Sequence, residues 1–248
     1  MQAGLKNKTA IVTGASRGIG RAIALKLGQS GASVVVNYAN NAKAADEVVS
    51  QITENGGQAV SLRADMQKIS EIKALFEASE RHFGSIDILV NNAGIALFKK
   101  IADITEKEFD DSFALNVKGL FFACQQAAQK MADGGKIINI SSSVTKMMLP
   151  DYGVYAATKG AVEQITKVLA KELGHRKIAV NAISPGPVDT ELFRQGKTEQ
   201  QIQNLADMAA FGRIGTPGDI AGAVLLLVSG EAGWISGQNL CVNGGFAA

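Results

Sequence analysis

The chain is poor in the residues that build covalently linked or metal-held folds. Its 248 residues include only two cysteines, two histidines, four prolines and one tryptophan. Two cysteines do not make a disulfide framework, and two histidines do not favour a metal site. We therefore expect Cys124 and Cys241 to be small, reduced core residues, no bound metal, and a fold held together by its hydrophobic core.

A charge excess of one sign and a long apolar run are also missing. Twenty-five basic and twenty-three acidic residues give a formal charge of +2, so nothing indicates binding to nucleic acid or to an anionic membrane. The longest aliphatic run, residues 223–228, is far too short to span a bilayer, and residues 1–8 contain no apolar export segment. We expect a cytoplasmic protein.

What the chain does contain is a regular alternation of strand-like and helix-like segments. Hydrophobic residues make up 46% of it, which is enough for a sizeable core. Strand patterns at residues 9–13, 33–38, 59–63, 86–90, 136–141, 178–183 and 239–242 alternate with helical patterns, one of which, 105–131, has an expected break near Asn116. This alternation predicts an α/β fold with a doubly wound, seven-stranded parallel sheet (Rossmann-like) in a single domain over residues 1–248, with ligands at the carboxyl ends of the strands.

Three glycines, Gly14, Gly18 and Gly20, lie between the first strand and the first helix. A glycine turn that opens a helix exposes backbone N–H groups at the positive end of the helix dipole, where a pyrophosphate binds without a side-chain clash. The spacing G-x-x-x-G-x-G differs from the more familiar G-x-G-x-x-G. Either pattern also serves a tight strand-to-helix turn with no ligand, so the segment alone leaves both readings open.

The end of the second strand bears on the choice of cofactor. In a dinucleotide fold this position faces the adenosine ribose, and NAD-selective sites usually have Asp or Glu there. This chain has Asn37 followed by Tyr38, and Arg17 in the glycine turn is placed to pair with a 2′-phosphate. The pattern favours NADP(H), with NAD(H) possible. The alternative for Arg17 is a solvated residue at the start of a helix.

Tyr155 and Lys159 are four residues apart in a helical pattern, so their side chains lie on one face, one turn apart. A cation about 4 Å from a phenol, at an effective dielectric of ~20, contributes roughly 4 kcal/mol and lowers the phenol pKa from ~10 by about three. The pair is then able to exchange a proton near neutrality. The alternative is an ordinary amphipathic helix.

Taken together, these segments resemble the short-chain dehydrogenase/reductase family in its single-domain form, over the whole chain. Residues 13–20 look like its cofactor turn, residues 91–94 like the motif that ends its fourth strand, and the catalytic tetrad is matched by Asn116, Ser142, Tyr155 and Lys159. Ser142 has the family spacing to Tyr155, although the adjacent Ser141 and Ser143 compete for the assignment.

The resemblance implies a role for each of these residues. Tyr155 is the general acid in carbonyl reduction and the base in alcohol oxidation, Ser142 donates a hydrogen bond to the reacting oxygen, and Lys159 lowers the phenol pKa and binds the nicotinamide ribose. Asn116 bends its helix and holds a water that links Lys159 to solvent. The implied cofactor contacts are Gly14, Ser16, Arg17, Gly18, Ile19, Gly20, Asn37, Tyr38, Asp65, Met66, Asn92, Ala93, Gly94, Tyr155, Lys159, Pro185, Gly186, Val188 and Thr190.

Three stretches are expected to line the substrate end: residues 95–98, 144–152 and 191–211. The last falls within a predicted lid at about 190–212, which lacks a rigid pattern and is expected to order on binding. An apolar, adaptable wall that suits an apolar carbonyl compound is expected from Met147, Met148, Leu149, Leu192, Phe193, Met208 and Phe211.

The sequence leaves three functions open. The first is an NADPH-dependent reductase of a small-molecule carbonyl compound. The second is a 3-oxoacyl-acyl-carrier-protein reductase, whose acidic carrier protein requires a basic patch such as Lys130 with Lys136, or Arg176 with Lys177. The third is a non-catalytic NADP sensor or scaffold. The resemblance also implies a homotetramer, formed through the two long helices and the C-terminal strand region; candidate contacts are Trp234, Ile235 and Phe246.

Overall fold

A single seven-stranded sheet runs through the protein. The computed structural model describes residues 4–247, so the ends of the predicted domain, 1–3 and 248, lie outside the described residues. The strand order is β3-β2-β1-β4-β5-β6-β7, and every pairing is parallel. The strands are β1 (Thr9–Val12), β2 (Ser33–Tyr38), β3 (Gln58–Arg63), β4 (Ile88–Asn91), β5 (Lys136–Ile140), β6 (Ala179–Pro185) and β7 (Asn239–Val242). The predicted fold class is confirmed.

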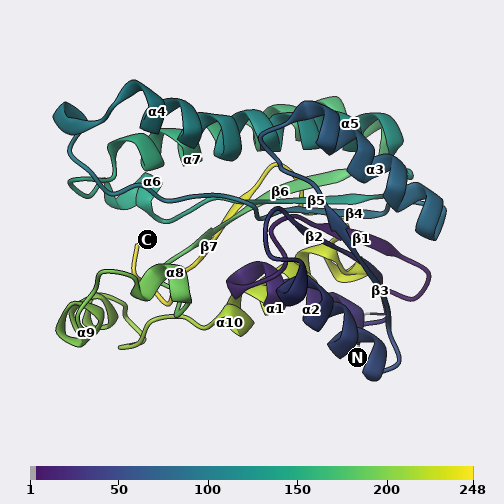
Figure 1. Cartoon of the computed structure of the whole chain (residues 1–248), viewed down its shortest axis with the longest axis horizontal. Helices are drawn as coiled ribbons and strands as arrows, with labels where there is room; N and C mark the ends of the chain where they lie inside the picture. Colours follow the sequence, from purple (N-terminus) through teal and green to yellow (C-terminus); the bar gives the residue numbers. More distant parts are fainter. Residues whose placement is uncertain (1–3, 248) are drawn as a thin grey trace.

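Helices cover both faces of this sheet (Figure 1). One layer contains α1 (Gly18–Gln29), α2 (Ala42–Glu54) and α10 (Pro217–Val228), and the other contains α3 (Ile69–Phe83), α4 (Glu106–Phe113), α5 (Leu120–Lys130) and α7 (Gly153–Glu172). Two hydrophobic clusters fill the spaces between sheet and helices, one on each face. Burial of the central strands on both faces explains why they read as continuous apolar runs.

Local signals in the sequence fix several helix starts. Asn41 accepts a hydrogen bond from the backbone N–H of Ala44 and so caps α2. Thr105 forms a capping box with Glu108 at α4, and Thr216 forms one with Asp219 at α10. Each cap satisfies N–H groups that have no partner within the helix.

The long helical region between β4 and β5 is interrupted, as expected, around Asn116. Residues Ala114–Gly119 form a π-helical turn between α4 and α5. Gly119 packs so closely there that a Cβ atom would lie 2.2 Å from the backbone oxygen of Met66. Turns of this kind are rare and are frequent at functional sites.

The segment predicted to be a lid contains two short helices, α8 (Glu191–Arg194) and α9 (Glu199–Asp207). No helix was assigned to this segment from the sequence. Thr190 caps α8, and Thr198 forms a capping box with Gln201 at α9. With α6 (Val144–Met147), these helices lie at the end of the molecule near the C-terminus (Figure 1). That the lid segment becomes ordered on ligand binding stays a prediction.

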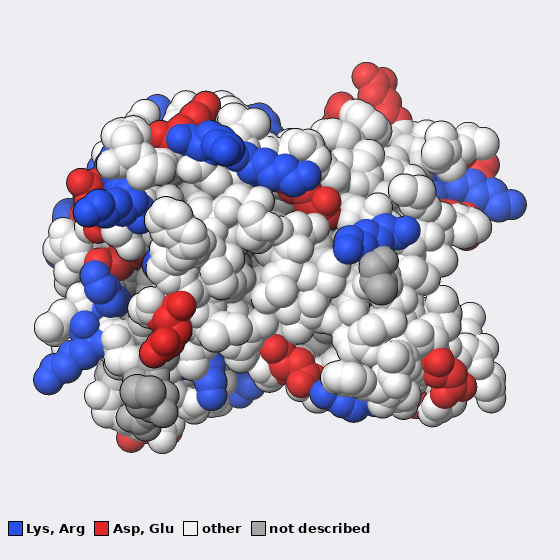
Figure 2. Space-filling model, turned by 180° about the vertical axis from the view of Figure 1, so that it is seen from behind, with Lys and Arg blue, Asp and Glu red and all other residues white. Residues whose placement is uncertain are grey.

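The surface carries charges of both signs. On the face shown in Figure 2, Lys and Arg side chains are interspersed with Asp and Glu around a largely uncharged centre. Several large apolar side chains are exposed, above all Trp234, which is 99% exposed. Within residues 4–247, none of the helices has the length and apolar character needed to cross a bilayer.

Candidate active site

The carboxyl ends of the strands surround one large cavity of about 710 Å³. Its walls come from the segments that follow β1, β2, β3, β4, β5 and β6, together with α7 and the lid segment. Every catalytic and cofactor-binding residue expected from the sequence lines this cavity except Asn116. The volume lies within the range of ligand sites, and the position is where doubly wound sheets bind ligands.

The glycine turn after β1 is held in a shape that other residues would not permit. Gly14 and Gly18 have positive φ values of 63° and 54°. A Cβ atom on Gly20 would lie 2.3 Å from the backbone oxygen of Gly14. The Asn92 amide fixes the turn from the opposite side, since its Nδ2 donates to the backbone oxygens of Thr13 (2.9 Å) and Gly14 (3.1 Å).

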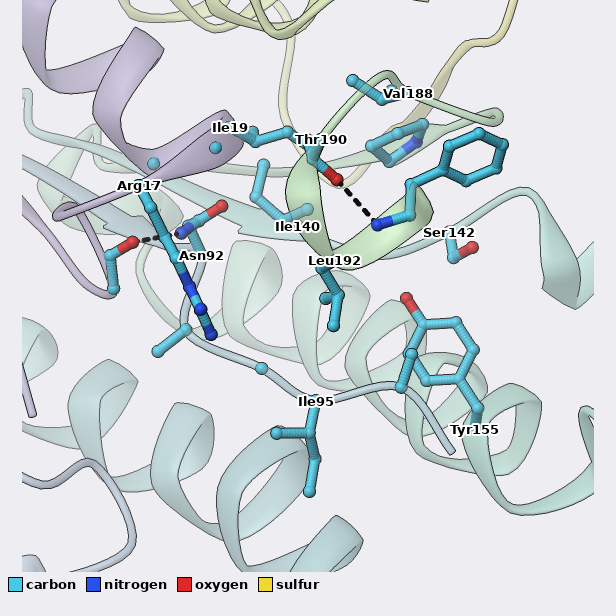
Figure 3. Close-up of a pocket in the computed structure, with 18 of the residues that line it drawn as sticks. Arg17, Ile19, Asn92, Ile95, Ile140, Ser142, Tyr155, Val188, Thr190 and Leu192 are labelled. Carbon is cyan, nitrogen blue, oxygen red and sulfur yellow. Dashed lines mark hydrogen bonds between the residues drawn. The ribbon is translucent and has the colours of Figure 1, made fainter. Parts of the chain in front are cut away.

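This turn fits the pyrophosphate of a dinucleotide. The first N–H groups of α1 face the cavity, because Gly18, Ile19 and Gly20 line it and no side chain caps the helix. Arg17, at the N-cap position, projects from the start of α1 into the same cavity (Figure 3). The residues present therefore suit a diphosphate with a further phosphate near Arg17.

The predicted ribose contact at the end of β2 needs a correction. Asn37 is 1% exposed, and its Oδ1 accepts from the backbone N–H of Gly14 (3.2 Å) while its Nδ2 donates to the backbone oxygen of Ala64 (3.1 Å). The amide thus braces the glycine turn and is not available to a ribose. Sequence reasoning missed the next cavity residues, Ala39, Asn40 and Asn41, which form the loop after Tyr38.

At the other end of the cavity the hydroxyl-bearing side chains of Ser142 and Tyr155 lie near each other (Figure 3). Ser142 comes from the loop after β5 and Tyr155 from the first turns of α7. The surroundings of the three serines favour Ser142. Ser141 donates to Glu163 (3.0 Å) and Ser143 to the backbone oxygen of Ser184 (3.3 Å), and both are buried, whereas Ser142 is partly open to the cavity.

Lys159 lies one turn beyond Tyr155 on α7 and is 5% exposed. Its Nζ donates to the backbone oxygen of Ile140 at 2.7 Å and lies 5.7 Å from the centroid of the Tyr155 ring. Burial lowers the pKa of the ammonium to about 8. The side chain therefore holds its proton less firmly than a solvated lysine does.

The expected lowering of the tyrosine pKa is absent from this structure. Burial raises the pKa of Tyr155 to about 12, and the hydrogen bond with Ser142 offsets only part of that effect. The ammonium of Lys159 donates its hydrogen bond to the backbone oxygen of Ile140 at 2.7 Å and lies 5.7 Å from the centroid of the phenol ring. At neutral pH Tyr155 is a protonated group, able to donate its proton.

Asn116 does not reach the cavity but fixes its wall. Its Oδ1 accepts from the backbone N–H of Ile95 (2.9 Å), and its Nδ2 donates to the backbone oxygen of Ile95 (2.8 Å) and to Thr158 Oγ1 (3.1 Å). The π-helical turn thereby holds the loop after β4 against α7. The water attributed to Asn116 stays a prediction.

The substrate end is mostly apolar, with some corrections to the expected lining. Met148, Met208 and Phe211 are exposed and do not line the cavity. The apolar side chains that do line this end are Ile95, Phe98, Met147, Leu149, Leu192, Phe193 and Leu205. Phe98 packs on Tyr152, with ring centroids 4.6 Å apart, and meets Tyr155 edge-on at 6.3 Å.

The fold and the site together define an oxidoreductase that uses a nicotinamide dinucleotide. Comparison with known proteins gives the narrower assignment. A family model described as enoyl-(acyl carrier protein) reductase matches residues 14–247. The short chain dehydrogenase/reductase nsrJ of Aspergillus novofumigatus is 40% identical, with 98% of this chain and 97% of that protein covered. The chain belongs to the short-chain dehydrogenase/reductase family.

Other similar proteins are named as reductases or dehydrogenases/reductases. The hydroxynaphthalene reductase-like protein Arp2 of Metarhizium brunneum is 41% identical, with 97% of this chain and 95% of that protein covered. Among solved structures, the angucycline C-6 ketoreductase LanV with bound NADP has a TM-score of 0.93 at 41% identity, covering 98% of this chain and 96% of that one. A short-chain dehydrogenase/reductase from Serratia marcescens has a TM-score of 0.95 at 39% identity, covering 99% and 100%.

Proposed function

We propose that this protein is an NADPH-dependent ketoreductase that reduces an apolar ketone to an alcohol, with Tyr155 as the proton donor. The observation that carries the proposal is the pair of hydroxyls, Ser142 and Tyr155, facing the apolar end of a cavity whose other end fits a dinucleotide. The raised pKa of Tyr155 keeps its proton in place until charge develops on the substrate oxygen.

The site residues orient the substrate carbonyl and supply a proton to its oxygen. A bound reduced nicotinamide supplies the hydride. Ser142 and Tyr155 both donate hydrogen bonds to the carbonyl oxygen, and both bonds strengthen as that oxygen becomes negative. Tyr155 then transfers its proton. The nearby cation of Lys159 favours the phenolate that remains, and Asn116 keeps the cavity wall at Ile95 in place.

NADPH is the preferred cofactor in this proposal. Arg17 is the cation that projects into the dinucleotide end, and the loop after Tyr38 offers Asn40 and Asn41 rather than carboxylates. We expect Arg17→Ala to raise the KM for NADPH about tenfold and to leave the KM for NADH nearly unchanged, because only NADPH carries the 2′-phosphate. Equal losses with both cofactors, in steady-state assays, would contradict the assignment.

The carrier-protein alternative is weakened by the position of its basic patch. Lys130, Lys136, Arg176 and Lys177 lie around the amino ends of β5 and β6, whereas the cavity opens at the carboxyl ends. Lys130 is also paired with Glu80 at 2.6 Å, and Arg176 with Asp133 at 2.8 Å. A carrier protein docked there would not reach the cavity, so a small-molecule ketone is the better substrate. The retained tyrosine and lysine argue against a non-catalytic sensor.

The reaction is tested by NADPH oxidation with a panel of bicyclic aromatic ketones, diketones, sugars and an acetoacetyl thioester. We expect turnover of the aromatic ketones and a loss of at least about 100-fold in kcat for Tyr155→Phe, because the proton donor is removed. NADPH binding should be retained, and Tyr152→Phe, which changes the neighbouring phenol, serves as the control. Full activity of Tyr155→Phe would refute the role of this residue, and turnover restricted to the thioester would restore the carrier-protein alternative.

We further propose that the protein is a cytoplasmic homotetramer. The apolar surface around β7 supports the assembly, since Trp234 is 99% exposed, and Ile235 and Leu240 are each 38% exposed. Among the described residues, β7 is also an edge strand, paired only with β6. Phe246 is instead 9% exposed and lines the cavity, so the expected role of this residue between subunits is replaced by one in the wall of the site.

A further inference from the structure

The lid segment (residues 190–212) contains a single lysine, and this lysine faces the substrate end of the cavity. Lys197 Nζ lies 5.2 Å from the centroid of the Phe98 ring and 4.9 Å from that of Phe193. It donates one hydrogen bond, to the backbone oxygen of Phe193 at 2.9 Å. Burial lowers the pKa of this ammonium, so the apolar wall has removed part of its hydration.

The charge of Lys197 is not neutralised by a neighbouring carboxylate. None of the ion pairs formed within residues 4–247 includes it. Glu191, the acidic residue of the same segment that lines the cavity, is exposed at the first turn of α8 and is also absent from those pairs. The lysine of the lid segment therefore presents a positive charge without an ion-pair partner, among the described residues, to the largely apolar substrate end.

Phe98 lies between this charge and the reacting end of the site. The centroid of its ring is 5.2 Å from Lys197 Nζ and 6.3 Å from the centroid of the Tyr155 ring. The distance from Lys197 Nζ to the centroid of the Tyr155 ring is therefore at most the sum of these two distances. We expect a molecule of one or two fused rings whose carbonyl meets Tyr155 to extend across Phe98 toward the ammonium. Its far side then lies beside the ammonium.

An anionic oxygen is the partner that such an ammonium lacks. The faces of the two phenyl rings attract a cation, but a charge-assisted hydrogen bond to a carboxylate or phenolate is stronger, and more so where water is partly excluded. We infer that Lys197 selects ketones that carry an anionic oxygen, as a carboxylate or an ionised phenol, on the side remote from the reacting carbonyl. This inference rests on the proposed function, because it names the substrate class of the same site.

A matched pair of probes, 4-acetylbenzoate and its methyl ester, separates recognition of charge from packing. The quantity measured is the ratio of kcat/KM for the acid to that for the ester, which cancels general losses of activity. Lys197→Met should lower this ratio at least tenfold, because it keeps an apolar chain of similar length without the charge. Lys197→Arg should stay within about threefold of the native ratio. Lys26→Met, which removes one positive charge from the exposed side of α1, should leave it unchanged.

Calorimetric titration of the protein–NADP⁺ complex with the two compounds gives the ratio of their dissociation constants, which measures the same preference for the acid without turnover. An equal loss for acid and ester in Lys197→Met, by both methods, would overturn the inference and leave Lys197 as a packing contact of the lid. If neither compound is reduced but the ratio of dissociation constants falls in Lys197→Met, the selection of anions stands and the proposed reaction fails. If acid and ester are both reduced and Lys197→Met changes neither the ratio of kcat/KM nor the ratio of dissociation constants, the proposed reaction stands and the selection of anions fails.

Discussion

At the scale of single residues, Lys159 imposes a cost on folding. Its pKa falls from 10.5 to about 8 on burial, which corresponds to about 3 kcal/mol against the charged form at neutral pH. The hydrogen bond to the backbone oxygen of Ile140 returns about 1 kcal/mol. The cost of burying the charge is the larger of the two, so the native protein is less stable with this lysine than with an apolar side chain of similar shape.

We therefore predict that Lys159→Met is more stable than the native protein by about 2 kcal/mol at pH 7, while its kcat falls at least 100-fold. The lysine pKa is lowered in the folded state, so native stability rises as the pH increases from about 8 toward 10.5. The difference in free energy of unfolding between Lys159→Met and the native protein should therefore be smaller by about 2 kcal/mol at pH 9.5 than at pH 7.

Urea unfolding of both proteins at pH 7 and pH 9.5 measures this difference. Lys167→Met, on an exposed face of α7, is the matched control and should change stability by less than about 0.5 kcal/mol. A Lys159→Met protein that is less stable than the native one at pH 7 would mean that the bond to Ile140 outweighs the burial of charge.

Tyr155 illustrates what spacing along a helix does not reveal. A separation of four residues puts the phenol and the ammonium on one face, as expected, but the ammonium bonds to Ile140, a strand residue that is distant in sequence. The expected fall in the phenol pKa required both the right face and the right direction of the Lys159 side chain. Only the first follows from helical periodicity.

At the scale of elements, the loop that carries Ser142 is held by one carboxylate of α7. Glu163 Oε1 accepts from Ser141 Oγ at 3.0 Å and from Thr145 Oγ1 at 2.7 Å, so it fastens the loop on both sides of Ser142. Glu163 lies one turn beyond Lys159 on the same helix, which couples the position of the serine to that of the other site residues. We assign Glu163 as a positioning residue.

We predict that Glu163→Ala lowers kcat about tenfold or more, because the hydroxyl of Ser142 loses its fixed direction toward the substrate oxygen. Glu163→Gln keeps an acceptor oxygen and should recover most of this loss. Thr145→Val removes one of the two bonds and should give an intermediate value. The KM for NADPH should stay within about twofold in all three, and an unchanged kcat in Glu163→Ala would remove the assignment.

The elements themselves were largely predictable, because apolar periodicity and glycine stops are local. β3, expected at residues 59–63, spans Gln58–Arg63, and the helix break near Asn116 appears as the π-helical turn. The helix α9 was missed although its capping box, Thr198 with Gln201, can be seen in the sequence. That signal is local, whereas the prediction of a lid was based on the polar composition of the whole segment.

The site was predictable where a sequence motif determines the backbone conformation. It was less predictable where the orientation of a side chain depends on contacts with residues distant in the sequence. The glycine turn follows from glycine spacing alone. Asn37 was misassigned because its amide turns inward, to groups of Gly14 and Ala64 that are distant in the chain. Lys197 was missed for the same reason, since its contact with Phe98 joins segments about a hundred residues apart. Long-range packing sets both directions.

At the scale of the whole molecule, the exposure of Trp234 calls for a partner surface. An indole side chain that becomes buried removes about 200 Å² from water, which contributes roughly 5 kcal/mol for each copy. The neighbouring Ile235 and Leu240 extend this apolar surface along the edge strand β7. In the proposed homotetramer, this surface forms one interface and the long helices form the other.

We predict that Trp234→Asp converts the tetramer to a dimer, because the charged side chain cannot be buried unpaired in the β7 interface while the helix interface is untouched. Sedimentation equilibrium over a range of concentrations measures the change, and Trp234→Phe, which keeps an apolar ring, should remain a tetramer. A native protein that sediments as a monomer would refute the assembly. A tetramer that survives Trp234→Asp would instead place the interface elsewhere, leaving Trp234 exposed in the assembly as it is in the single chain.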